Sequence, residues 1–159
     1  MSQPASSDVD RQWLHEAIEL SRQCPPSSSA FSVGAVVVAA SGSVLGTGYS
    51  RERSPVDHAE EVALAAVAES GLDAFLAGAT LYSSLEPCAA RASRPVPCAD
   101  LIIASGIRRV VIAWREPPIF VPGGGAVRLR QAGVHIRVIP ELAAAARAVN
   151  AHLLSGESI

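Results

Sequence analysis

Residues 80–114 have the sequence TLYSSLEPCAARASRPVPCADLIIASGIRRVVIAW. Thr80–Ser84 and Arg109–Trp114 are short runs whose composition favours β-strands. Between them, Cys98–Ser105 has the pattern of a helix, which Gly106 ends. A strand, a helix and a second strand in succession predict two parallel strands joined by a right-handed crossover. This segment therefore favours an α/β fold.

On the N-terminal side, the sequence predicts a helix, a hairpin and a second helix. Apolar residues recur at helical spacing within Arg11–Cys24, and two prolines follow. Val33–Ala40 and Val44–Ser50 are extended runs around a Ser-Gly-Ser turn, which indicates a β-hairpin. His58–Ser70 is rich in alanine and apolar on nearly all sides, so it is expected to be a buried helix.

On the C-terminal side, a loop rich in proline and glycine runs from Glu116 to Gly125. A short helix at Ala126–Ala132, a strand at Val134–Ile139 and a final helix at Glu141–Leu154 are expected to follow. Five strands with helices on both faces then form one α/β domain.

The domain boundaries follow from these elements. Residues 11–154 are expected to form a single domain, because 159 residues suffice for one core and not for two. Residues 1–10 are expected to form a loose N-terminal tail, and residues 155–159 a C-terminal tail.

The amino-acid composition limits the partners and the location that are expected for this chain. With 49% hydrophobic and 18% charged residues, the chain is typical of a globular protein. A formal charge of −2 offers no basic track for a nucleic acid, so none is expected as a partner. Apolar runs fall short of the roughly 18 residues that a membrane span needs. The polar N-terminus lacks the pattern of a secretory signal, so a cytoplasmic location is expected.

One histidine and two cysteines have the pattern of a metal site. His58 opens a predicted helix, Cys88 follows a strand, and Cys98 begins a helix. They supply three zinc ligands and leave a fourth position open, which is typical of a catalytic site and not of a structural one. Both cysteines lie near helix N-termini, which favour thiolates. Cys24 is expected to take no part.

Glu60 is the predicted proton carrier of this site. Zinc lowers the pKa of bound water to about 7, which provides hydroxide at neutral pH. A carboxylate that is beside the metal, and not bound to it, can take that proton and pass it to a ring nitrogen and to departing ammonia. A pattern of His-x-Glu, Pro-Cys and a second Cys is typical of zinc deaminases that act on nucleobases. Taken singly, a histidine at a helix start or a buried cysteine is usually a structural residue.

On these residues, the sequence resembles the cytidine-deaminase-like superfamily from about residue 11 to residue 154. The resemblance implies a three-layer α/β/α fold whose mixed five-stranded sheet has the order 2-1-3-4-5. The chain is most similar to the riboflavin-pathway pyrimidine deaminases, of the diaminohydroxyphosphoribosylaminopyrimidine deaminase type. The similarity of this chain to these deaminases rests on residues 31–36, 48–52, 58–60 and 114–117, and on the ten-position step from Cys88 to Cys98.

The sequence also departs from those relatives. Two-domain bacterial members carry a reductase half, which is not found in these 159 residues. They usually have Asn-Pro before the first strand, where this chain has Phe31-Ser32. A different aminopyrimidine or a pterin-like ring is therefore an open alternative.

Substrate contacts are predicted mainly from the resemblance. Arg91 and Arg94 are candidates for a phosphate because a guanidinium pairs with phosphate oxygens through two hydrogen bonds, although loop arginines are more often surface residues. Trp114 and Phe120 would pack either on the ring or on a neighbouring subunit. The predicted substrate-binding residues are Ser32, Ser50, Arg51, Ala59, Glu86, Arg91 and Arg94.

The predicted function is hydrolytic deamination of an aminopyrimidine, most simply a phosphorylated one from the riboflavin pathway, by a zinc enzyme that forms a homodimer. One alternative is a deaminase of another nucleoside, free base or pterin-like ring in salvage or secondary metabolism. Another is an inactive, zinc-stabilised binding module, although such a module has no need of Glu60.

Overall fold

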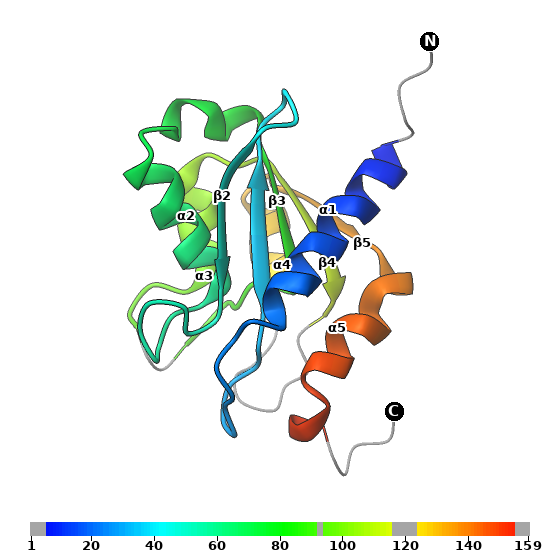
Figure 1. The fold of residues 1–159 in the computed structure, drawn as a ribbon. Helices are drawn as coiled ribbons and strands as arrows, with labels where there is room; N and C mark the ends of the chain where they lie inside the picture. Colours follow the sequence, from blue (N-terminus) through cyan, green and yellow to red (C-terminus); the bar gives the residue numbers. More distant parts are fainter. Residues whose placement is uncertain (1–5, 92–93, 116–123, 155–159) are drawn as a thin grey trace.

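In the computed structural model, which describes residues 6–91, 94–115 and 124–154, five strands form one mixed sheet (Figure 1). The strand order is β2-β1-β3-β4-β5, as the resemblance implied. The strands are β1 (Gly34–Val38), β2 (Val44–Tyr49), β3 (Thr80–Leu85), β4 (Arg109–Trp114) and β5 (His135–Val138).

Strand directions divide the sheet into two parts. The hairpin strand β1 runs antiparallel to both β2 and β3. The strands β3, β4 and β5 run parallel to one another, so the predicted parallel pairing is confirmed. All of β1 is buried, as expected for a strand covered by helices on both faces.

Helices cover both faces of the sheet and complete the α/β/α arrangement (Figure 1). One face carries the second, third and fourth helices, which contact one another in that order, and the opposite face carries the first and the fifth. The helices are α1 (Ser6–Ser21), α2 (Ala59–Glu69), α3 (Cys98–Ser105), α4 (Gly125–Gln131) and α5 (Ala143–Val149). Three short 3-10 helices lie at Asp73–Gly78, Pro140–Leu142 and Ala151–Leu153. Within the described part of the chain, no helix combines the length and the apolar character that crossing a membrane requires.

Two predicted boundaries are wrong. Helix α1 begins at Ser6, so residues 6–10 belong to the folded domain and not to a loose tail. The predicted helix over residues 141–154 is three shorter pieces, because Pro140 opens a 3-10 turn and Asn150 ends α5. The outermost tail residues, 1–5 and 155–159, lie outside the described residues.

The early start of α1 has a physical reason at Asp10. Its carboxylate is 1% exposed and accepts hydrogen bonds from Tyr82 (2.8 Å), Arg109 (2.9 and 2.5 Å) and Arg137 (2.7 Å). Burial raises the pKa of Asp10, but the hydrogen bonds from Arg109 and Tyr82 and the charge of Arg109 together lower it below its ordinary value. The helix is thereby fixed to three strands of the sheet.

Replacing Asp10 with asparagine is expected to lower the free energy of unfolding by about 2–3 kcal/mol. This is at or just below the roughly 3–5 kcal/mol for breaking a fully buried ion pair, because both arginine side chains are 30% exposed. Since folding lowers the pKa of Asp10, its contribution is complete above about pH 4 and is lost as the pH falls through the folded-state pKa. Urea unfolding at pH 7 and at pH 2.5 measures this, with exposed Glu16→Gln in the same helix as control. An equal loss at both pH values would contradict the assignment.

Candidate metal centre and active site

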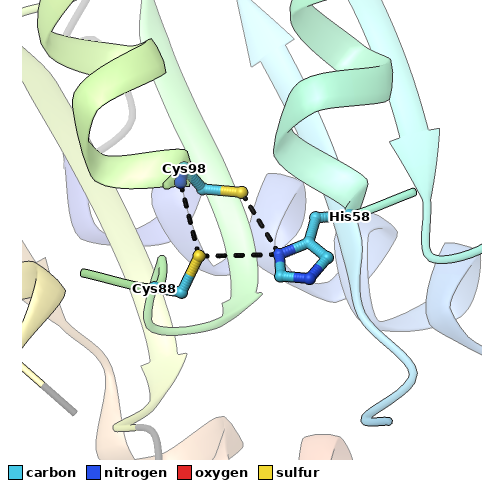
Figure 2. A group of neighbouring side chains, drawn as sticks. All are labelled: His58, Cys88 and Cys98. Atoms are coloured by element: carbon cyan, nitrogen blue, oxygen red, sulfur yellow. Dashed lines mark hydrogen bonds between the residues drawn. The ribbon is translucent and has the colours of Figure 1, made fainter. Parts of the chain in front are cut away.

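His58, Cys88 and Cys98 lie together at one edge of the sheet (Figure 2). His58 is the N-cap of α2, Cys88 follows β3, and Cys98 is the first residue of α3. The Nδ1 atom of His58 lies 3.6 Å from the Cys88 sulfur and 3.4 Å from the Cys98 sulfur. All three ligand atoms lie within 4.8 Å of one another.

The geometry fits a zinc ion. With Zn–S near 2.3 Å and Zn–N near 2.05 Å, tetrahedral ligands are separated by about 3.6 Å, close to both distances from His58 Nδ1. One imidazole nitrogen and two thiols form a typical zinc donor set. Both cysteines are buried and unpaired by disulfides. The predicted zinc ligands therefore occupy positions suited to the metal.

The Cys88 side chain is held in the form that binds metal. The backbone N–H of Cys98 donates to the Cys88 sulfur at 3.3 Å. Hydrogen bonds from Cys98, followed by those from His58, outweigh burial and lower the pKa of Cys88 to about 4. The thiolate is the form of cysteine that binds metals. Its pairing with Cys88 raises the pKa of Cys98.

Close backbone contacts place these ligands. At Gly48 of β2, an added Cβ would lie 2.5 Å from the Ala59 carbonyl oxygen, so only glycine lets the start of α2 approach the sheet this closely. At Gly125 of α4, an added Cβ would lie 1.6 Å from the Pro87 carbonyl oxygen. Part of the predicted glycine-rich loop thus packs against the residue before Cys88.

Glu60 lies in the first turn of α2 and is 4% exposed. Its Oε1 is 2.7 Å from the hydroxyl of Ser83, which also lies 2.7 Å from the Leu85 carbonyl oxygen. A hydroxyl has one hydrogen, so it donates to one of these acceptors at a time. Burial raises the pKa of Glu60, against the charge of His58 and the Ser83 hydrogen bond. The carboxylate is beside the predicted ligands and is not one of the three grouped atoms.

A cavity of about 500 Å³ opens onto this site. Its volume lies within the range of small-molecule sites. Among the lining residues are Phe31, His58, Glu60 and Cys88. Phe31 makes an edge-on ring contact with Trp114, at 5.4 Å between centroids, whereas Phe120 lies outside the described residues.

Five of the seven predicted substrate-binding residues line the cavity: Ser50, Arg51, Ala59, Glu86 and Arg91. Within the described part of the chain, Ser32 and Arg94 are not among its lining residues. Arg94 borders a separate hollow that residues of α2 and α3 also line. A role of any of the seven residues in substrate binding stays a prediction.

Arg51 holds the cavity wall. Its guanidinium donates to the carbonyl oxygens of Pro25 and Phe31 and to the Ser32 hydroxyl, at 2.7–3.1 Å. Its own backbone has a φ of 61°, in the left-handed region that few side chains adopt. From the opposite side, Asn150 pairs with both backbone groups of Ser32, at 2.6 and 3.0 Å.

Glu86 joins the metal-site loop to α4. Its carboxylate is 4% exposed and accepts the Ala126 N–H at 2.8 Å. Its backbone N–H donates to the Trp114 carbonyl oxygen at 2.8 Å. The residue therefore fixes the ends of β3 and β4 at the cavity.

The sequence prediction missed Glu61 and Asp57, which bind the two loop arginines. Arg91 and Arg94 both lie within 3.3 Å of Glu61 Oε1, and Arg94 also lies 3.1 Å from Asp57. Glu61 also accepts the backbone N–H of His58 at 3.0 Å. A glutamate three residues after a helix N-cap is the capping-box position, so this signal was present in the sequence.

Comparison with known proteins agrees with this geometry. Residues 7–114 match the family described as cytidine and deoxycytidylate deaminase zinc-binding region. Over 123 residues, 77% of the chain, the identity to diaminohydroxyphosphoribosylamino-pyrimidine deaminase of Schizosaccharomyces pombe is 41%. The relative of the same name from Buchnera aphidicola is 34% identical over 130 residues, which is 81% of this chain and 83% of the relative.

A solved structure has a similar fold. It is the diaminohydroxyphosphoribosylaminopyrimidine deaminase/5-amino-6-(5-phosphoribosylamino)uracil reductase of Thermotoga maritima, with a TM-score of 0.75 and 32% identity over 91% of this chain. The chain spans 40% of that protein and 30% of the S. pombe relative. The match over residues 7–114, the similar relatives and the zinc-ligand geometry show that the chain belongs to the cytidine and deoxycytidylate deaminase family.

Proposed function

We propose that this chain is a zinc-dependent hydrolytic deaminase of a phosphorylated aminopyrimidine in riboflavin biosynthesis. The observation that carries the proposal is the buried Glu60 carboxylate, which lines the same cavity as His58 and Cys88. A binding module without catalysis has no need of a buried carboxylate there. The relatives named as pyrimidine deaminases support the substrate class.

Different residues of the chain have different roles in the proposed reaction. His58, Cys88 and Cys98 would hold zinc, which lowers the pKa of a water molecule at its open position to about 7. Glu60 takes one proton from the water and delivers it to the ring nitrogen, and then takes the second proton from the new hydroxyl group and delivers it to the amino group. A C–O bond forms, the C–N bond breaks, and ammonia leaves. Ser83 lies within hydrogen-bond distance of one Glu60 oxygen and helps to orient the carboxylate.

Phosphate recognition is proposed for Arg91, with Arg94 as the second candidate. Arg91 lines the cavity, its side chain is 1% exposed, and its Nε has no hydrogen-bond partner among the described residues. A buried guanidinium N–H without an acceptor is costly, and a phosphate oxygen would provide one. Arg94 borders a second hollow, and its Nε already lies 3.3 Å from Glu61 Oε1, so it offers a phosphate less than Arg91 does.

The phosphate preference is expected to appear in the wild-type kinetics. One charged hydrogen bond is worth about 1.5–3 kcal/mol, so removing the phosphate should lower kcat/KM about 10- to 150-fold. Ammonia release from diaminohydroxyphosphoribosylamino-pyrimidine and its dephosphorylated form measures this. Equal kcat/KM values for the two substrates would exclude phosphate recognition. They would favour the alternative of a deaminase in salvage or secondary metabolism.

A homodimer in the cytoplasm is proposed for the assembly and location. Among the described residues, Phe75 is the most exposed of the large hydrophobic side chains, at 56%, and it is our candidate for a subunit contact. Three free cysteines suit a reducing compartment. Sedimentation equilibrium of the zinc-loaded chain tests the homodimer. Fractionation of the source cells tests the cytoplasmic location.

A further inference from the structure

The two halves of the metal site are joined by side chains outside the ligand set. Glu61 Oε1 accepts the backbone N–H of His58 at 3.0 Å and a hydrogen bond from Arg91 Nη2 at 3.1 Å. Arg91 Nη2 also donates to the Val56 carbonyl oxygen at 2.8 Å. Arg91 Nη1 lies 4.0 Å from the Cys98 sulfur, at the limit for a hydrogen bond to sulfur.

We propose that Glu61 and Arg91 are a positioning pair for the metal centre, which connects the His58 ligand to the Cys98 ligand. The inference rests on the proposed zinc site and goes beyond its three ligands. Arg91 is the loop residue of the pair, and Glu61 is the helix residue. Neither one supplies a metal-binding atom in the site described above.

The pair gives the Cys98 sulfur a charged donor. The Cys88 sulfur already receives the backbone N–H of Cys98, so each sulfur has one N–H directed at it. Hydrogen bonds to a metal ligand fix its orientation and adjust its electron donation, and their loss typically costs about 10- to 100-fold in metal affinity or activity. Because the Arg91 side chain is 1% exposed, water does not readily replace it.

Arg94 provides a matched control. It comes from the same loop and lies 3.3 Å from the same Glu61 oxygen, and it pairs with Asp57 at 3.1 Å. Its side chain is 38% exposed, and no contact with a ligand atom is found for it within the described part of the chain. It therefore shares the Glu61 ion pair of Arg91 without the contact to sulfur.

The first experiment measures zinc dissociation from the intact chain into a chromogenic chelator. Arg91→Ala should release zinc about 10- to 100-fold faster than wild type, while Arg94→Ala should stay close to the wild-type rate. Glu61→Gln keeps an acceptor for the His58 N–H but loses the ion pair, so it should fall between them. Combining Glu61→Gln with Arg91→Ala should add little to Arg91→Ala alone, because both act through one contact.

The second experiment replaces zinc with cobalt(II) and records the sulfur-to-cobalt charge-transfer band. Removing an N–H from a thiolate makes the sulfur a better electron donor. The band should therefore move to lower energy in Arg91→Ala and stay in place in Arg94→Ala. Circular dichroism of each variant shows whether the fold is retained, and Arg91→Lys, with a shorter donor, gives a milder test if Arg91→Ala does not fold.

Two results would overturn the inference. Equal acceleration of zinc release in both arginine variants would mean that the loop ion pairs matter and the sulfur contact does not. Unchanged zinc release and an unchanged band in Arg91→Ala, with a loss confined to phosphorylated substrate, would make Arg91 a phosphate ligand only. If wild type releases no ammonia but zinc dissociation follows the expected order, the proposed function fails and this inference stands.

Discussion

Replacing Glu60 with glutamine is expected to reduce ammonia release about 10²- to 10⁴-fold while the zinc content stays at the wild-type level. Glutamine keeps the size of the side chain and a hydrogen-bond partner for Ser83, but it cannot take a proton from water. Because Glu60 is 4% exposed, a neutral amide removes the cost of burying a charge, and thermal stability should not fall.

The measurement combines steady-state ammonia release with elemental analysis of the same preparation. Glu69→Gln is the matched control, since Glu69 ends the same helix and its side chain is 60% exposed in a surface ion pair with Arg53. Loss of zinc together with activity in Glu60→Gln would make Glu60 a ligand, contrary to the proton-carrier role.

Cys98→Ala is expected to remove zinc and all detectable deamination. Cys98 is fully buried and its sulfur lies 3.4 Å from His58 Nδ1, so the variant has two of the three ligands and a gap beside them. Metal binding is coupled to folding, so the free energy of unfolding should fall as well. Cys24→Ala, at the half-exposed third cysteine, should keep both zinc and activity.

Elemental analysis after dialysis and chemical unfolding measure these effects. Full zinc occupancy in Cys98→Ala would disprove the ligand set. A loss of zinc in Cys24→Ala would show that the third cysteine takes part.

Much of the metal site could be predicted because its residues mark the ends of elements. His58 and Cys98 begin helices, and Cys88 follows a strand, and the pattern of one histidine and two cysteines in these positions groups them as zinc ligands. The order of the strands followed from the resemblance, and the directions followed from the hairpin and the crossovers.

The missed features depend on contacts between distant residues. Asp10 pairs with Arg109 and Arg137, which are 99 and 127 positions away. A polar residue near the N-terminus gives no local sign of such partners, so the start of α1 was placed too late. Asn150 reaches Ser32 over 118 positions, and no local pattern indicates it.

Side-chain partners also change what a candidate residue can do. Arg51 was predicted to bind substrate from its position at a strand end, but its guanidinium holds three groups of the cavity wall. Arg91 was predicted as a phosphate ligand from its type, and its burial against Glu61 gives it a second role at the metal. Residue type and position predict where a side chain lies more reliably than which partner it takes.

The most direct test of the account is to titrate the metal-free chain with zinc while ammonia release from diaminohydroxyphosphoribosylamino-pyrimidine is recorded. With one site made by His58, Cys88 and Cys98, activity should rise linearly and level off at one zinc per chain. Ammonia release by the metal-free chain, or none at full zinc occupancy, would contradict the proposal that this chain is a zinc-dependent deaminase of that substrate.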